Sequence, residues 1–162
     1  MSYDISYLIA LREQDQYRVR VGLENVRGVI QAHLRSPQIW RATLALNPPY
    51  MNCVINGTDC SAYNGTYTPL PVLASSEGTT VQFDSNISSN GFTLRGEPCN
   101  AFGSSGEIEC IVRPIIDWTT GCSASPCIDR PTLVRVRFQL IQINDYKINV
   151  VNHEFTEYLV VR

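Results

Sequence analysis

Hydrophobic residues recur at helical spacing through the first 35 positions of the chain, where no proline occurs. The pattern predicts one long helix over residues 4–35, about 45 Å in length at 1.5 Å per residue. Arg12 and Gln16 interrupt the apolar stripe, so the helix divides into two halves. The second half has the continuous apolar face of a helix that packs on a core, whereas the first is expected to project. The stripe consists of Ile5, Leu8, Ile9, Val19, Leu23, Val26, Ile30 and Leu34.

A second, shorter helix is predicted over residues 37–46. Ser36 suits the position before a helix, and Pro37 suits the first helical position because its backbone torsion is already set. The sequence Asn47-Pro48-Pro49 is expected to end this helix, since a residue before proline disfavours helical geometry. Residues 47–78 contain Asn-Gly pairs and further prolines, and are predicted to form a connecting loop.

Alternating apolar and polar residues predict strands in the rest of the chain. The clearest run is 132–143, where Val134, Val136 and Phe138 alternate with polar side chains. Shorter strands are expected at 79–83, 91–95 and 108–113, with a weak segment at 146–151 and a closing strand at 156–162. The sequence therefore predicts a single α+β domain over 1–162, with the long helix packed on an antiparallel sheet region over 79–162.

Composition and charge narrow the functional classes. Apolar residues make up 44% and charged residues 17% of the 162 positions, which predicts a folded domain rather than a disordered tail. The formal net charge is −2, with acids and bases interspersed. This distribution lacks the basic footprint of a nucleic-acid-binding protein, so no nucleic-acid partner is expected.

Six cysteines lie in the second two-thirds of the chain, among Gly, Ser, Asn and Pro. An even number of cysteines in loop-rich sequence indicates disulfides and an oxidising compartment, although six allow fifteen pairings. Pairing between sequence neighbours is predicted, which would give disulfide-stabilised loops. Metal binding and free structural cysteines are the alternatives. The C-x6-C, C-x10-C and C-x4-C spacings are wider than the C-x2-C pairs of zinc ribbons, and no metal or other cofactor is expected. The predicted pairs are Cys53 with Cys60, Cys99 with Cys110, and Cys122 with Cys127.

The order of these elements resembles that of type IV pilins and pseudopilins: a long N-terminal helix, a variable connection, an antiparallel sheet and a disulfide-closed region near the C-terminus. The family's leader-cleavage motif is not in the sequence, so the resemblance is one of organisation. It implies a pilin-like αβ-roll, and a subunit that is membrane-anchored before it assembles with other pilin subunits. The expected location is a filament at the cell surface, reached through the inner membrane and periplasm.

The resemblance implies a non-enzymatic structural subunit, a minor pilin or pseudopilin that assembles into or caps a type IV pilus or a type II secretion filament used for adhesion, motility or secretion. The chain has no run of 18 apolar residues, and the membrane half of the helix is expected to be represented only by its end. The apolar residues of that end are the expected assembly interface: Ile5, Leu8, Ile9 and Leu11.

Residues suited to catalysis are few, and no catalytic residue is predicted. His33 lies beside the apolar stripe of the long helix, and His153 resembles a turn residue. Glu107 with Glu109, or Asp117 with Asp129, could be paired carboxylates, but a solvated face is the plainer interpretation. Asp117 and Asp129 could also bind calcium, yet no D-x-D-x-D-G pattern supports this. No known nucleophile, phosphate-binding or zinc-protease motif occurs.

A secreted, disulfide-rich adhesin or lectin-like module is the alternative interpretation. Three Asn-x-Ser/Thr sequons, at Asn56, Asn64 and Asn86, would be glycan acceptors in a eukaryotic secreted protein. The loop tyrosines form a candidate recognition surface for a ligand, because amphipathic rings suit one-sided burial. They are Tyr50, Tyr63 and Tyr67.

Overall fold

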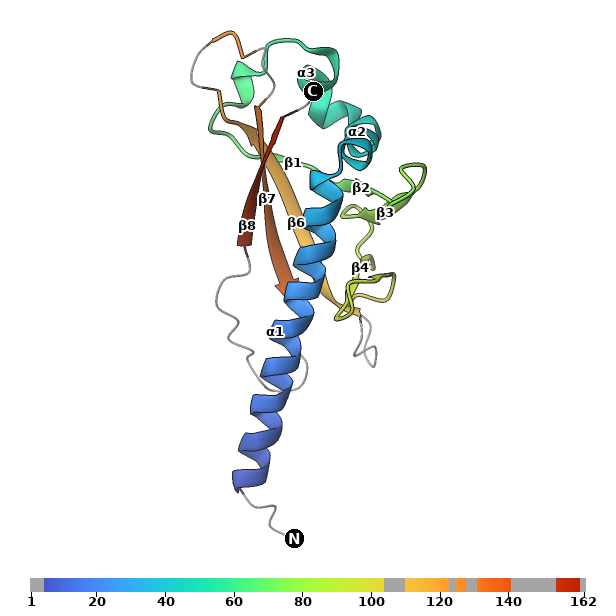
Figure 1. Ribbon diagram of the computed structural model, residues 1–162, viewed down its shortest axis with the longest axis vertical. Coiled ribbons are helices and arrows are strands. Elements are labelled where there is room, and N and C mark those ends of the chain that lie inside the picture. Colours follow the sequence, from blue (N-terminus) through green and yellow to red (C-terminus); the bar gives the residue numbers. More distant parts are fainter. Residues whose placement is uncertain (1–4, 104–109, 123–124, 128–130, 141–153, 161–162) are drawn as a thin grey trace.

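A computed structural model describes residues 5–103, 110–122, 125–127, 131–140 and 154–160, with the side chains of the first helix described from residue 13. The helices are α1 (Ile5–Arg35), α2 (Pro37–Leu46), α3 (Pro48–Asn56) and the 3₁₀ turn η1 (Ser61–Tyr63). The strands are β1 (Thr68–Pro69), β2 (Val72–Ala74), β3 (Val81–Asp84), β4 (Gly91–Thr93), β5 (Pro98–Cys99), β6 (Cys110–Thr120), β7 (Pro131–Leu140) and β8 (Glu154–Val160). Figure 1 shows α1 running along the larger sheet, with its N-terminal half extending beyond the strands.

The predicted pilin-like αβ-roll, with one antiparallel sheet over 79–162, is wrong. The described residues form two antiparallel sheets, one of six strands and one of two, together with one long and two short α-helices. Two strands lie outside the predicted sheet region, because β1 and β2 fall in the stretch predicted to be a loop. The fold is α+β only at the coarse level, with three disulfides.

Helix α3 lies where the sequence predicted a loop after residue 47. The prediction took the two prolines only as the end of α2, but proline also suits the start of a helix. Pro48 and Pro49 occupy the first turn of α3, where a missing N–H leaves no helical hydrogen bond unmade. Buried Asn47 ends α2 and precedes α3, and its amide oxygen and nitrogen pair with the backbone of Val72 at 3.0 and 2.8 Å. Asn47 therefore ties both short helices to β2.

The larger sheet has the strand order β5-β4-β6-β7-β8, with β1 paired to β6 on the same edge as β4. Strand β7 confirms the alternation predicted from residue 132, within its described part: Val134 and Val136 are fully buried, whereas Arg137 is exposed. Residues 141–153, which include the predicted segment 146–151, lie outside the described residues.

Helices α1 and α2 match the long and short helices predicted over 4–35 and 37–46. Ser36 Oγ accepts a hydrogen bond from the backbone N–H of Ile39, as expected for a cap. At its C-terminal end α1 is tied to β8 by an ion pair between Arg35 and Glu157, at 3.0 Å. The second half of α1 packs on the sheet through the predicted stripe, with Val19, Leu23, Val26, Ile30 and Leu34 buried.

The three disulfides join the predicted neighbours: Cys53 with Cys60, Cys99 with Cys110, and Cys122 with Cys127. The second bond connects β5 to β6, the two strands on either side of β4. The first and third lie side by side, because the backbone N–H of Cys60 donates to the carbonyl of Cys127 at 3.1 Å.

Candidate functional site

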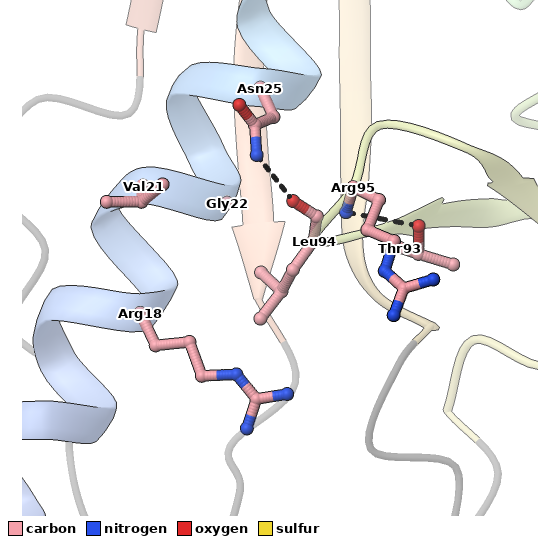
Figure 2. Close-up of a pocket in the computed structure, with 7 residues that line it drawn as sticks. All are labelled: Arg18, Val21, Gly22, Asn25, Thr93, Leu94 and Arg95. Atoms are coloured by element: carbon pink, nitrogen blue, oxygen red, sulfur yellow. Dashed lines mark hydrogen bonds between the residues drawn. The ribbon is translucent and has the colours of Figure 1, made fainter.

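A cavity of about 320 Å³ lies between α1 and the turn that joins β4 to β5. Figure 2 shows that Arg18 comes from the helix and Arg95 from the turn, with Leu94 between them. Val21 and Asn25 of α1 complete the helical wall. We call this cavity the arginine groove.

The turn at the groove is fixed by its own hydrogen bonds. The backbone N–H groups of Arg95 and Glu97 donate to Thr93 Oγ1 at 3.2 and 3.3 Å. Gly96 adopts a left-handed conformation with φ of 82°, and a Cβ there would meet Val29 Cγ2 at 2.8 Å. Glycine is therefore required at this position both by its torsion and by the closeness of the helix.

The helix receives the turn through two contacts. Asn25 Nδ2 donates to the carbonyl of Leu94 at 3.0 Å, across 69 positions of sequence. The Leu94 side chain lies against the backbone at Gly22, so close that a Cβ there would overlap it. Gly22 thus has the packing role that a glycine inside a helix suggests, because it allows close approach.

The charged side chains that line the arginine groove are both positive. Arg18 and Arg95 are both exposed, and neither makes an ion pair within the described part of the chain. Guanidinium groups present a planar array of donors that matches carboxylates and phosphates. Beside the aliphatic Leu94 and Val21, the arrangement suits an anionic group carried on a partly apolar ligand.

A second charged cluster lies on β6 and β7, where two arginines share one carboxylate. Arg135 donates two hydrogen bonds to the Asp117 carboxylate, at 2.9 and 2.6 Å, and Arg137 donates a third at 3.0 Å. The hydrogen bond to Asp117 raises the pKa of the Arg135 guanidinium above its ordinary value. Tyr67 covers the other side of Arg135, with its ring centroid 3.7 Å from the guanidinium carbon.

A shallow hollow of about 640 Å³ is lined in part by Arg113, whose guanidinium is also bound within the protein. The guanidinium donates to the backbone carbonyls of Ser85 and Ser88 and stacks near Phe102. This arginine therefore fastens the loop after β3 to β6, and it contrasts with the unpaired arginines of the arginine groove.

The predicted recognition tyrosines do not gather on one exposed tip. Tyr50 and Tyr63 are half-buried and pack against the core. The Tyr63 ring lies 5.0 Å from Trp118, and its backbone carbonyl accepts a hydrogen bond from Thr119. Tyr67 alone of the three is exposed, and it stacks on Arg135.

The predicted assembly residues Ile5, Leu8, Ile9 and Leu11 all lie in the first turns of α1. Their side chains are outside the described part. The described residues that follow them, 13–18, are exposed apart from Gln16, which is half-buried; Tyr17 is 69% exposed. Among the described side chains of α1, from residue 13 onwards, core contact begins at Val19.

The histidines and carboxylates considered for catalysis or metal binding are the remaining candidates. His33 Nδ1 lies 2.8 Å from the carbonyl of Val29, and because a carbonyl only accepts, this nitrogen carries the proton. The Asp117 carboxylate accepts hydrogen bonds from Arg135 and Arg137. His153, Asp129, Glu107 and Glu109 lie outside the described residues. Where the structure is described, no three His, Cys, Asp or Glu side chains are grouped so as to hold a metal ion.

Sequence reasoning missed Arg18, Leu94 and Arg95 as site residues. Gly22 was the only available signal, since a glycine in a long helix indicates that something packs closely there. The sequence does not say that the partner is a turn about 70 positions away, and the groove appears only when α1 and β4 are brought together.

The disulfides place the protein in an extracellular or periplasmic, oxidising compartment. In the described part of the chain, no helix has the length and apolar character needed to cross a membrane. Comparison with protein-family models, curated proteins and solved structures finds no match.

Proposed function

We propose that this chain is the head of a filament-forming subunit, a minor pilin or pseudopilin that assembles into or caps a type IV pilus or type II secretion filament. The observation that carries the proposal is the extent of α1. The helix continues N-terminally to Ile5 from Val19, the first buried residue among its described side chains. This part is on the order of 20 Å long at 1.5 Å per residue.

An extended helix of this kind needs cover to be stable. Short helical segments are marginal in water, and most helical stability in proteins comes from packing of an apolar face. The projecting segment has four large aliphatic residues at its start, Ile5, Leu8, Ile9 and Leu11. Helices of neighbouring subunits would cover them, which gives these residues the role of an assembly interface.

Export is part of the proposal. The subunit would be anchored in the inner membrane before assembly and would fold its disulfide-bonded head on the periplasmic side, from which it enters a filament at the cell surface. Its role would be structural rather than enzymatic, in adhesion, motility or secretion. The disulfides support the oxidising part of this route.

Fractionation of the native gene product tests the proposal. Filaments sheared from cells that produce it should contain the protein, detected by an antibody against the head. Ile9→Glu should lower the filament-bound amount at least tenfold, because a charge would enter an apolar interface. Ala32→Glu adds the same charge at an exposed position of the half of α1 that packs on the sheet, and should change little. Recovery of the protein only in the soluble secreted fraction would contradict the proposal.

A secreted binding module is the second candidate, favoured by the placement of the sequons. Asn56, Asn64 and Asn86 are all exposed, so each could accept a glycan. The intact mass of the native protein before and after enzymatic removal of N-glycans distinguishes the two functions. A mass loss of whole glycans supports the module, whereas an unchanged mass together with recovery in filaments supports the subunit.

A further inference from the structure

We infer that the arginine groove receives the acidic turn Glu13–Asp15 of a second copy of this chain. The inference rests on the proposed function, because it concerns neighbouring subunits of one assembly. It commits to a partner of defined chemistry: a carboxylate presented on a helix that lies alongside α1.

Unpaired charge on both sides is the first argument. Within the described residues, Arg18 and Arg95 have no acidic partner, and the carboxylates of Glu13 and Asp15 have no basic one. Arg113, which lines the other surface hollow, differs from them because backbone carbonyls accept its hydrogen bonds. One molecule therefore carries an open cationic site and an open anionic segment on the same helix.

Spacing along the helix is the second argument. The acidic turn is centred about seven residues before the middle of the groove, which lies near Val21 and Gly22. At 1.5 Å per residue, a parallel neighbour shifted by about 11 Å along the helix axis would bring its acidic turn level with the groove. Such a shift repeats in the same direction from copy to copy, so the contact is heterologous and extends into an open filament.

The position of the acids around the helix gives the contact two possible orientations of the neighbour. Residues two apart are separated by about 200° around an α-helix, so Glu13 and Asp15 point to nearly opposite sides. A neighbouring helix that faces the groove with either of these two sides brings one carboxylate near it. The aliphatic wall of Val21 and Leu94 would cover the stems of the longer side chains.

Photo-crosslinking in the filament tests the inference. A benzophenone amino acid replaces Val21, which is 43% exposed on the groove wall, in the native gene product. Filaments are assembled from mixed ¹⁴N and ¹⁵N copies, so that peptides joined between copies have mixed isotopes. The expected product links position 21 to a peptide containing residues 13–18. The control probe replaces Tyr158, which is 60% exposed on β8, and should not link to that peptide.

Charge exchange gives the second readout. The double variant Arg18→Glu, Arg95→Glu should lower the yield of the mixed-isotope product at least fivefold, and adding Glu13→Arg, Asp15→Arg to the same chain should restore it. All four positions are exposed, so the fold should persist, and circular dichroism checks this. Products that join position 21 to another protein or another segment would overturn the inference while leaving the filament function intact. Absence of the protein from filaments would overturn both.

Discussion

Leu94 lies against the backbone of α1 at Gly22, where an added Cβ would come within 2.8 Å of the Leu94 Cβ. This contact connects the long helix to the turn after β4 and forms the floor of the arginine groove. The close approach depends on glycine, because any larger residue would push the turn and its Arg95 away from the helix.

Gly22→Ala should therefore destabilise the protein by about 1–2 kcal/mol, since overpacking against Leu94 outweighs the gain in helix propensity. Gly28→Ala is the matched control on the same helix. Gly28 has no atom within 4 Å of its would-be Cβ, so alanine there should stabilise by about 0.5–1 kcal/mol. Urea unfolding under oxidising conditions measures both. Effects of the same sign at the two positions would contradict the packing role of Gly22.

The carboxylate of Asp117 should contribute more stability than a surface ion pair. It is 10% exposed and bonds to both Arg135 and Arg137. Asp117→Asn removes the charge at similar size, and it should cost about 2 kcal/mol because the arginines are only partly buried. Glu24, paired to Arg27 at 3.9 Å and 73% exposed, is the control. Glu24→Gln should change the unfolding free energy by less than about 0.5 kcal/mol. Equal effects of the two substitutions would show that the Asp117 cluster adds no more stability than a surface ion pair.

Asp59 should make stability depend on pH in the acid range. The backbone N–H groups of Ser61 and Cys127, with the Ser61 hydroxyl, lower the pKa of the Asp59 carboxyl below its ordinary value of 3.8. A lowered pKa adds stability above the unfolded value, and this contribution is lost as the pH falls through the folded one. Asp59→Asn should thus be less stable than the wild type at pH 6, and the difference should shrink below about pH 4. Urea midpoints at both pH values measure this; a constant difference would contradict it.

The Cys99–Cys110 disulfide should hold the turn of the arginine groove in place. It joins β5 to β6 and so encloses β4, from which the turn leaves. Replacing both cysteines by serine should cost about 3 kcal/mol in the chain-entropy treatment of a loop of this length. It should also speed tryptic cleavage after Arg95. Serine replacements at Cys122 and Cys127, at the other disulfide-bonded end, should leave the rate of cleavage after Arg95 unchanged. Equal cleavage rates in the two double variants would contradict the bracing role.

Local pattern predicted α1, α2 and β7 because their chemistry repeats along the chain. The buried stripe from Val19 to Leu34 and the alternation around Val134 are visible without any tertiary contact. Helix α3 was missed because Pro48 and Pro49 both end one helix and suit the start of the next. Strand β6 was predicted to stop at Arg113, although it continues to Thr120 through Pro114 with Ile116 and Trp118 buried.

The candidate site was harder to predict than the helices and strands, because it depends on contacts between residues far apart in the sequence. The neighbour pairing of cysteines followed from sequence spacing, and the three disulfides confirm it. The groove depends on the contact between Asn25 and Leu94, 69 positions apart. Likewise, Asp117 was considered with Asp129 as a carboxylate pair, whereas its partners in the structure are arginines on the adjacent strand.

Hydrogen exchange of α1, in the assembled and the free protein, tests the filament assignment most directly. Backbone amides from Ile5 to Arg18 should exchange at least tenfold more slowly in sheared filaments than in the free chain, because neighbouring helices cover them. The amides of β7, already paired on both sides, should exchange at the same rate in both states. Unchanged exchange along α1, with new protection around Tyr67 on binding a ligand, would contradict the filament role.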